Sequence, residues 1–98
     1  MKINEVTVDY VLNDYLHDDP TDAGNRATVE AAMPAAKTFI MKHTSLTEEE
    51  INEYDDLTFA YLIIIEDLYD NHTAYTNNVH ANRTFDTILS LHSKNAIG

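Results

Sequence analysis

Residues 57–72 read LTFAYLIIIEDLYDNH and give the strongest structural signal in the chain. A helix that buries one face needs apolar residues at positions i, i+3, i+4 and i+7. One set fits that spacing: Leu57, Ala60, Tyr61, Ile64 and Leu68. A second apolar set falls on the remaining faces: Phe59, Leu62, Ile63 and Ile65. A helix that is apolar nearly all round is either buried among other helices or covered by a partner.

The composition favours one small helical domain. The chain has 98 residues, of which 44% are hydrophobic, and this length predicts a single domain over residues 1–98. There are only 2 Gly and 2 Pro, which favours long helices over turn-rich β structure. No cysteine is present, so disulfides and thiolate metal ligands are excluded. We therefore expect an all-α domain of four to five helices with a long central apolar helix.

The charge is strongly acidic. The net charge is −11, from 17 Asp and Glu against 6 Lys and Arg. Most carboxylates precede Leu57, and only Glu66, Asp67, Asp70 and Asp86 follow Asp56. Specific binding of nucleic acid through its phosphates needs a basic surface, which this chain does not carry. The acidic surface indicates either simple solvation, repulsion of DNA, or contact with a basic protein.

Neither a signal peptide nor a membrane span is expected. The N-terminal sequence MKINEVTVDYV has no apolar core of the signal-peptide kind. The longest apolar run, Phe59–Ile65, is far shorter than the roughly 20 residues that cross a bilayer. We expect synthesis in the cytosol and no membrane partner.

Helix signals divide the rest of the chain. Thr7 is an expected N-cap for a helix ending near His17, before Asp18-Asp19-Pro20. Asp22 or Asn25 begins a second helix, which Pro34 should kink or split. Its expected buried face is Val29, Ala32, Met33, Ala36 and Ile40.

The later signals define the remaining segments. Thr47 and Glu50 form a capping box that begins a short helix over Glu48–Glu53. Asp55 or Asp56 caps the apolar helix, which ends near Asn71. A loop over 72–82 and a last helix from Asn82 or Thr84, with Phe85, Ile88, Leu89 and His92 inward, complete the chain. Residues 92–98 are expected to form a loose tail.

Catalytic and metal-binding patterns are weak. Asp19–Glu30 has the length of a calcium-binding EF-hand loop, but Thr21 and Ala23 stand where oxygen-rich ligands belong. No pair among His17, His43, His72, His80 and His92 has the i, i+4 spacing of two metal ligands on one helix. Glu66 and Asp70 are i, i+4 neighbours without any sign of an activated base. We expect no enzyme activity, no cofactor and no metal.

The second apolar set of the 57–72 helix is either core or a subunit interface. Large exposed apolar patches on small proteins mark interaction sites, and aromatic residues are enriched in them. The candidate subunit or partner contacts are Phe59, Leu62, Ile63, Tyr69, Asn71, His72 and Tyr75.

The order of these segments resembles the small head–tail connector (adaptor) proteins of long-tailed bacteriophages. The resemblance covers most of the chain and lies in Asp14-Tyr15-Leu16, the acidic turn Asp18-Asp19, residues 35–40, residues 44–47 and the final segment Phe85–Leu91. Its most specific part runs from Asp56-Leu57-Thr58 to Asp67-Leu68-Tyr69-Asp70-Asn71. The family often has glycine where Ser45 stands and arginine where His72 stands, and Pro34 is unusual.

The resemblance implies a structural virion protein located at the neck, the head–tail junction, after assembly in the host cytoplasm. Such proteins form a homo-oligomeric ring, usually twelvefold, beneath the portal protein. They extend the channel through which DNA passes without specific binding, and they dock the stopper or tail-completion protein. The resemblance also implies that the C-terminal tail reaches the portal, through Leu91, His92, Ser93, Lys94 and Asn95.

Two other hypotheses stay open from the sequence. The charge of −11 also suits a small acidic helical binding module, such as a regulator or a DNA-mimicking inhibitor. A metal-dependent enzyme using the carboxylates and histidines is the third. Salt-sensitive binding to a basic protein favours the binding module, and a thermal shift with divalent ions favours the enzyme.

Overall fold

The computed structural model describes residues 1–70, and this part of the chain is helical without any strand. A 3-10 turn η1 (Ile3–Glu5) and a π-helical segment η2 (Tyr10–Tyr15) precede three α-helices: α1 (Ala23–Thr44), α2 (Glu48–Ile51) and α3 (Asp55–Asp70). The all-α prediction is confirmed for these residues. The predicted loop 72–82, last helix and tail lie outside the described residues.

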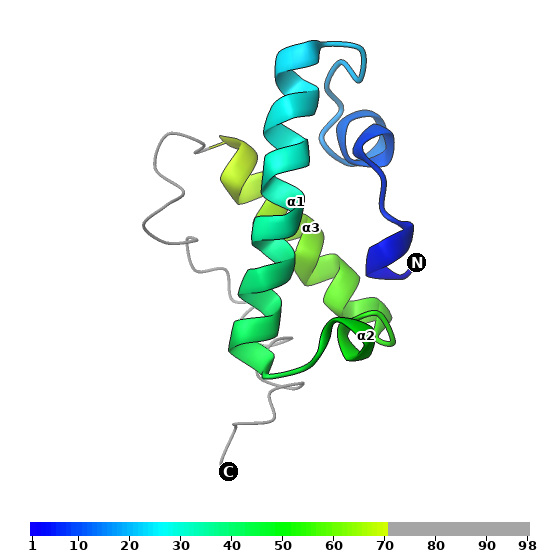
Figure 1. The fold of residues 1–98 in the computed structure, drawn as a ribbon. Helices are drawn as coiled ribbons and strands as arrows, with labels where there is room; N and C mark the ends of the chain where they lie inside the picture. Colours follow the sequence, from blue (N-terminus) through cyan, green and yellow to red (C-terminus); the bar gives the residue numbers. More distant parts are fainter. Residues whose placement is uncertain (71–98) are drawn as a thin grey trace.

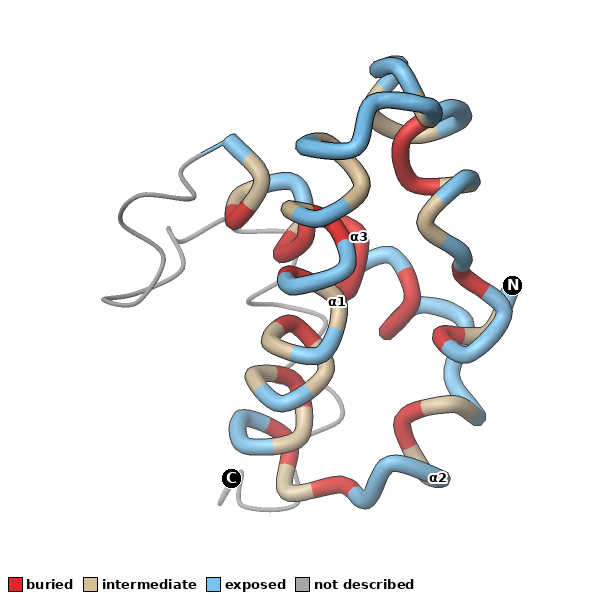
Figure 2. The backbone as a smooth tube through the Cα atoms, turned by 45° about the horizontal axis from the view of Figure 1, so that its top comes forward, coloured by how far each residue is buried: buried red, intermediate tan, exposed pale blue. Residues whose placement is uncertain are grey.

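Helices α1 and α3 form the main packed pair. Figure 1 shows α3 crossing behind α1, with η1 and η2 on one side and α2 near the C-terminal end of α1. The predicted inward face of α3 is confirmed, because all five of its residues are at most 4% exposed: Leu57, Ala60, Tyr61, Ile64 and Leu68. Ile65 is also fully buried. Figure 2 shows buried positions recurring along both helices.

Helix α1 begins where the sequence predicts. The Asp22 carboxylate accepts a hydrogen bond of 2.8 Å from the Asn25 N–H, which satisfies one of the unpaired donors of the first turn. Val29, Ala32, Ala36 and Ile40 are buried as predicted, and Met33 is half-buried.

Of the two outcomes expected at Pro34, a kink or a split of α1, the split does not occur. The helix runs continuously from Ala23 to Thr44 with Pro34 inside it. Proline removes the hydrogen bond to the carbonyl of Glu30. Glu30 and Pro34 are both exposed, so water can satisfy that carbonyl and the helix continues.

The first predicted helix is a π-helix rather than an α-helix, and it ends at Tyr15 instead of His17. Thr7 acts as expected, since its hydroxyl accepts a hydrogen bond from the Tyr10 N–H. The Leu16 N–H then bonds to the carbonyl of Val11, five residues back. The adjacent Val11 and Leu12 are both fully buried, because the wider turn directs both side chains into the core.

The connection from α1 to α3 is stabilised by caps. Ser45 takes the left-handed conformation with φ 60°, so the αL helix end forms on a serine. The buried Thr44 hydroxyl donates to the carbonyl of Ile40 and accepts from the Leu46 N–H. The predicted capping box of Thr47 and Glu50 is confirmed.

Two helix boundaries near α3 differ from the prediction. Helix α2 ends at Ile51 rather than Glu53, because the Asn52 side chain bonds back to the carbonyl of Glu48 and accepts from the Asn4 N–H. Helix α3 begins at Asp55, so Asp55 and Asp56 both lie in its first turn, where the helix dipole favours a carboxylate.

The exposed His17 has φ 56°, a conformation that costs about 1–2 kcal/mol for a residue with a Cβ. Replacing His17 with glycine should raise the free energy of unfolding by about 0.5 kcal/mol, because the relief of strain exceeds the added entropy of the unfolded chain. His17→Val should lower it, since a β-branched residue fits this conformation worst. Urea denaturation of both variants measures the two effects, and a glycine variant less stable than the valine variant would contradict this account.

Candidate interface on helix α3

The solvent-facing side of α3 combines carboxylates with two apolar side chains. Phe59 is 49% exposed, the highest value for a large hydrophobic residue within this helix. Ile63, one turn further along, is half-buried. The helical repeat of 3.6 residues places both on one stripe with four exposed acidic residues. We call this surface the Phe59 face; it comprises Asp55, Asp56, Phe59, Ile63, Glu66 and Asp70.

The candidate contact residues predicted from the sequence lie in different surroundings in the structure. Phe59 and Ile63 lie on the Phe59 face. Leu62 is only 6% exposed and belongs to the hydrophobic core, which is the other alternative that the sequence left open for this set. Tyr69 is half-buried. The other candidates lie outside the described residues: Asn71, His72, Tyr75, Leu91, His92, Ser93, Lys94 and Asn95.

Two tyrosine–carboxylate pairs join the N-terminal segment to α3. The Tyr15 hydroxyl donates to Glu66 Oε1 at 3.1 Å, and the Tyr69 hydroxyl donates to Asp18 Oδ2 at 2.7 Å. Each segment thus supplies one donor and one acceptor. Burial and the neighbouring Glu66 raise the pKa of Tyr15 to about 12. These bonds give Tyr69 a role within the protomer, independent of any partner.

A hollow lies beside α1 on the other side of α3 from the Phe59 face. The Tyr61 side chain is 2% exposed and lines this hollow, and its hydroxyl makes no hydrogen bond to another described residue. Two positions along a helix correspond to a rotation of about 200°, so Tyr61 and Phe59 point in nearly opposite directions. The Tyr61 hollow has a volume of about 480 Å³ and is lined by Met33, Pro34, Lys37, Thr38, Met41, Glu48 and Tyr61.

Sequence reasoning missed the Tyr61 hollow because its residues look like ordinary core residues. Met33 and Tyr61 have helical core spacing, and the pattern does not reveal how far the neighbouring helix extends over them. The charged residues of its lining, Lys37 and Glu48, are an ordinary exposed ion pair and give no sequence signal.

The ionisation of Tyr61 should make stability depend on alkaline pH. Burial raises the pKa of Tyr61 from 10.0 to about 12. Because the folded pKa lies above the unfolded value, this stabilisation is complete below pH 10 and is lost as the pH rises toward 12. Tyr61 should account for a loss of about 2 kcal/mol across this window.

Tyr61→Phe should remove that part of the pH dependence. Chemical denaturation of the wild type and the variant at both ends of the window, with tyrosinate absorbance as a second signal, measures it. Equal pH dependence in the two proteins would show that Tyr61 does not ionise with unfolding. Tyr15 and Tyr69, whose pKa values are also raised to about 12, titrate in both proteins and therefore cancel in the difference.

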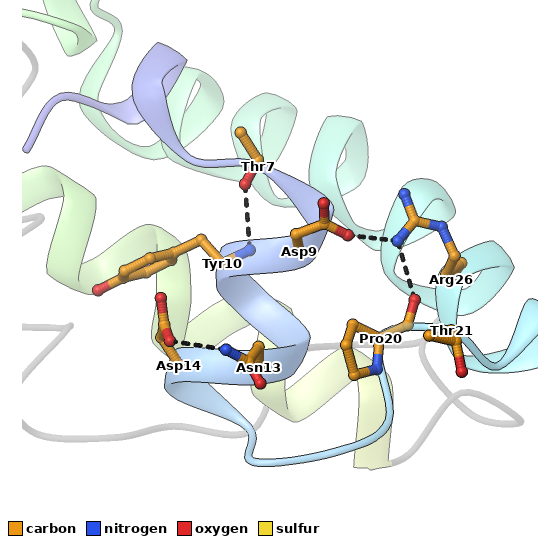
Figure 3. A pocket seen from close by; sticks show the side chains of 8 residues that line it. All are labelled: Thr7, Asp9, Tyr10, Asn13, Asp14, Pro20, Thr21 and Arg26. Carbon is orange, nitrogen blue, oxygen red and sulfur yellow. Dashed lines mark hydrogen bonds and ion pairs between the residues drawn. The ribbon is translucent and has the colours of Figure 1, made fainter.

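A second hollow, between η2 and the start of α1, is lined mostly by residues with polar or charged side chains. Figure 3 shows Arg26 reaching between the Asp9 carboxylate and the carbonyl of Pro20, with both interactions formed. Residues 23–30 belong to α1, so the twelve-residue EF-hand loop considered over Asp19–Glu30 does not form. Among residues 1–70, no three His, Asp or Glu side chains come together as a metal site. Within the same residues, no helix is both long enough and apolar enough to span a bilayer.

Comparison with known proteins gives no assignment. No protein-family model matches the chain, and neither a curated protein nor a solved structure is significantly similar to it.

Proposed function

We propose that this chain is a structural assembly protein of a bacteriophage neck, a head–tail connector that forms a homo-oligomeric ring beneath the portal protein. The observation that carries the proposal is the Phe59 face. A large aromatic side chain that is 49% exposed on the solvent-facing side of a helix is typical of a contact surface. The ring would extend the DNA channel and dock the stopper or tail-completion protein.

The order of the helices supports the proposal. The connector resemblance expects an opening helical segment, an acidic turn, a long helix, a capping box and a second long apolar helix. The elements η2, α1, α2 and α3 follow this order, with the capping box at Thr47 and Glu50. Ser45 also adopts the left-handed helix end at the position where the family often has glycine.

The charge supports a role around DNA without DNA binding. Residues 1–70 carry 16 of the 17 acidic residues and 4 of the 6 basic ones. A channel wall with an excess of carboxylates repels phosphates and does not retain the passing DNA. No catalysis is part of this proposal.

Negative-stain electron microscopy of the protein, alone and mixed with the portal protein from the same genome, tests the proposal. We expect rings with a central hole, or an added layer on the portal. Assembly on the portal alone also supports it, because the portal can act as a template. Single small particles that leave the portal unchanged would contradict it.

An acidic binding module is the second candidate, favoured by the same excess of carboxylates. It predicts a monomer that binds a basic protein with an affinity that falls steeply as salt rises. The apolar contact of the connector proposal predicts portal binding that largely survives a rise in salt concentration. A titration of the portal complex with sodium chloride therefore separates the two functions.

A further inference from the structure

We infer that residues 84–91 of this same chain dock into the Tyr61 hollow, with Phe85 as the inserted side chain. This stretch reads TFDTILSL, follows α3 in the chain and lies outside the described residues. Phe85, Ile88 and Leu89 have the i, i+3, i+4 spacing of one apolar helical face, which needs an apolar surface to cover it. The inference goes beyond the proposed ring and does not depend on it.

The Tyr61 hollow offers such a surface. Four of its seven lining residues are apolar or aromatic: Met33, Pro34, Met41 and Tyr61. Thioether sulfur makes favourable contacts with aromatic rings, so Met33 and Met41 suit the phenyl group of an arriving side chain. Phe59, on the opposite side of α3, projects into solvent itself. The hollow, rather than the Phe59 face, therefore complements the projecting side chains of the segment.

The Tyr61 hydroxyl favours an occupant that also carries hydrogen-bonding groups. Among residues 1–70 every enclosed side-chain nitrogen or oxygen has a hydrogen-bond partner, whereas this hydroxyl has none. It therefore reaches the open space of the hollow, although Tyr61 is only 2% exposed. A phenol hydroxyl both donates and accepts a hydrogen bond. The hydroxyl of Thr84, next to Phe85 in the sequence, can pair with it.

The charge of the hollow suits an occupant without net charge. Lys37 and Glu48, the only charged residues of the lining, form an ion pair at 3.3 Å, so the lining is neutral. Residues 83–91 carry Arg83 and Asp86, and their net charge is also zero. A strongly basic or acidic partner would gain no electrostatic attraction in this hollow. The apolar contacts therefore decide which segment binds there.

The chain itself brings the segment to the hollow. Tyr61 lies nine residues before the end of α3 at Asp70, which corresponds to about 14 Å along the helix. Residues 71–83 connect α3 to the segment, and a linker of this length reaches up to about 43 Å when extended. Tethering by such a linker gives the segment an effective concentration in the millimolar range. The chain's own segment is therefore favoured over a separate molecule.

Cross-linking within one chain tests this contact directly. The chain contains no cysteine, so pairs of cysteines can be placed without background. Thr38→Cys marks the exposed rim of the hollow and Thr84→Cys marks the segment, while Phe85 is retained. The full chain with both cysteines is treated at high dilution with a short bismaleimide, and the peptides of the monomer band are identified by mass spectrometry. Asn13→Cys with Thr84→Cys is the matched control, because Asn13 is exposed on η2 and does not line the hollow.

The inference predicts a 38–84 cross-link at least about tenfold more abundant than the 13–84 cross-link, because docking raises the effective concentration of the two thiols. Adding Phe85→Ser should reduce the yield to that of the control, whereas Phe85→Leu should retain most of it. Equal yields from the two cysteine pairs, or a 38–84 link found mainly between two chains, would overturn the inference. Such a failure leaves the connector proposal intact, because the experiment uses no portal, and a missing layer on the portal leaves this inference intact.

Discussion

A Phe59→Ser substitution is expected to abolish assembly on the portal while leaving the protomer folded. Phe59 is 49% exposed, so its removal should change the free energy of unfolding by no more than about 1 kcal/mol. In a repeated interface the same loss occurs at every contact. An aromatic side chain at the centre of an interface contributes about 2–4 kcal/mol, which lowers the affinity of each contact at least about tenfold.

Sedimentation of the portal mixture, with urea denaturation of the free variant, measures both effects. Phe59→Tyr is the matched control, because it keeps the ring and should still assemble. Asn13→Ser, at an exposed position on η2, controls for a general change of the surface. If Phe59→Ser sediments with the portal as the wild type does, the Phe59 face is not the contact surface.

Leu62→Asp should have the largest effect on folding. Leu62 lies three residues after Phe59 but is only 6% exposed, within the core. An unpaired carboxylate buried there, together with the lost apolar contacts, should cost about 4 kcal/mol or more. Small domains are stable by about 5–15 kcal/mol in total, so the variant should lose most or all of its cooperative thermal transition.

Circular dichroism during heating measures this loss. Leu62→Met provides the control, since it conserves apolar volume and should cost less than about 1.5 kcal/mol. A Leu62→Asp protein that unfolds with the wild-type transition would show that Leu62 faces outward, which is one of the two alternatives that the sequence left open.

The contrast between Phe59 and Leu62 shows how far the sequence determined the site. Helical spacing correctly predicted the inward face of α3, because five apolar residues repeat with the period of the helix. The second apolar set could not be divided from the sequence. Its members differ only in which neighbours cover them: Leu62 and Ile65 are buried, and Phe59 is not. Which of these side chains is covered by neighbouring residues depends on how α1 and α3 cross.

Helix caps were predicted more reliably from the sequence than irregular backbone conformations. Asp22 and the Thr47–Glu50 box act as expected, because each needs only residues three positions apart. The π-helical winding of η2 was not predicted, and the sequence did not decide whether α1 would continue through Pro34 or be split there. Both depend on surroundings: the core that holds Val11 and Leu12, and the solvent beside Pro34.

Contacts between segments that are far apart in the chain could not be predicted from the sequence. Tyr15 bonds to Glu66 and Tyr69 bonds to Asp18, and each pair is separated by 51 residues. Neither tyrosine has a sequence neighbour that marks its partner. The Tyr61 hollow belongs to the same class, because it combines residues of α1, α2 and α3.

Native mass spectrometry of the portal from the same genome, incubated with an excess of this protein, tests the connector proposal most directly. The proposal predicts one saturated complex, in which the portal gains a single closed ring with a fixed number of 11.1 kDa copies, twelve if the family pattern holds. Phe59→Ser should leave only the mass of the portal. A wild-type mixture in which the portal mass is unchanged, or in which the number of bound copies varies without saturation, would contradict the proposal.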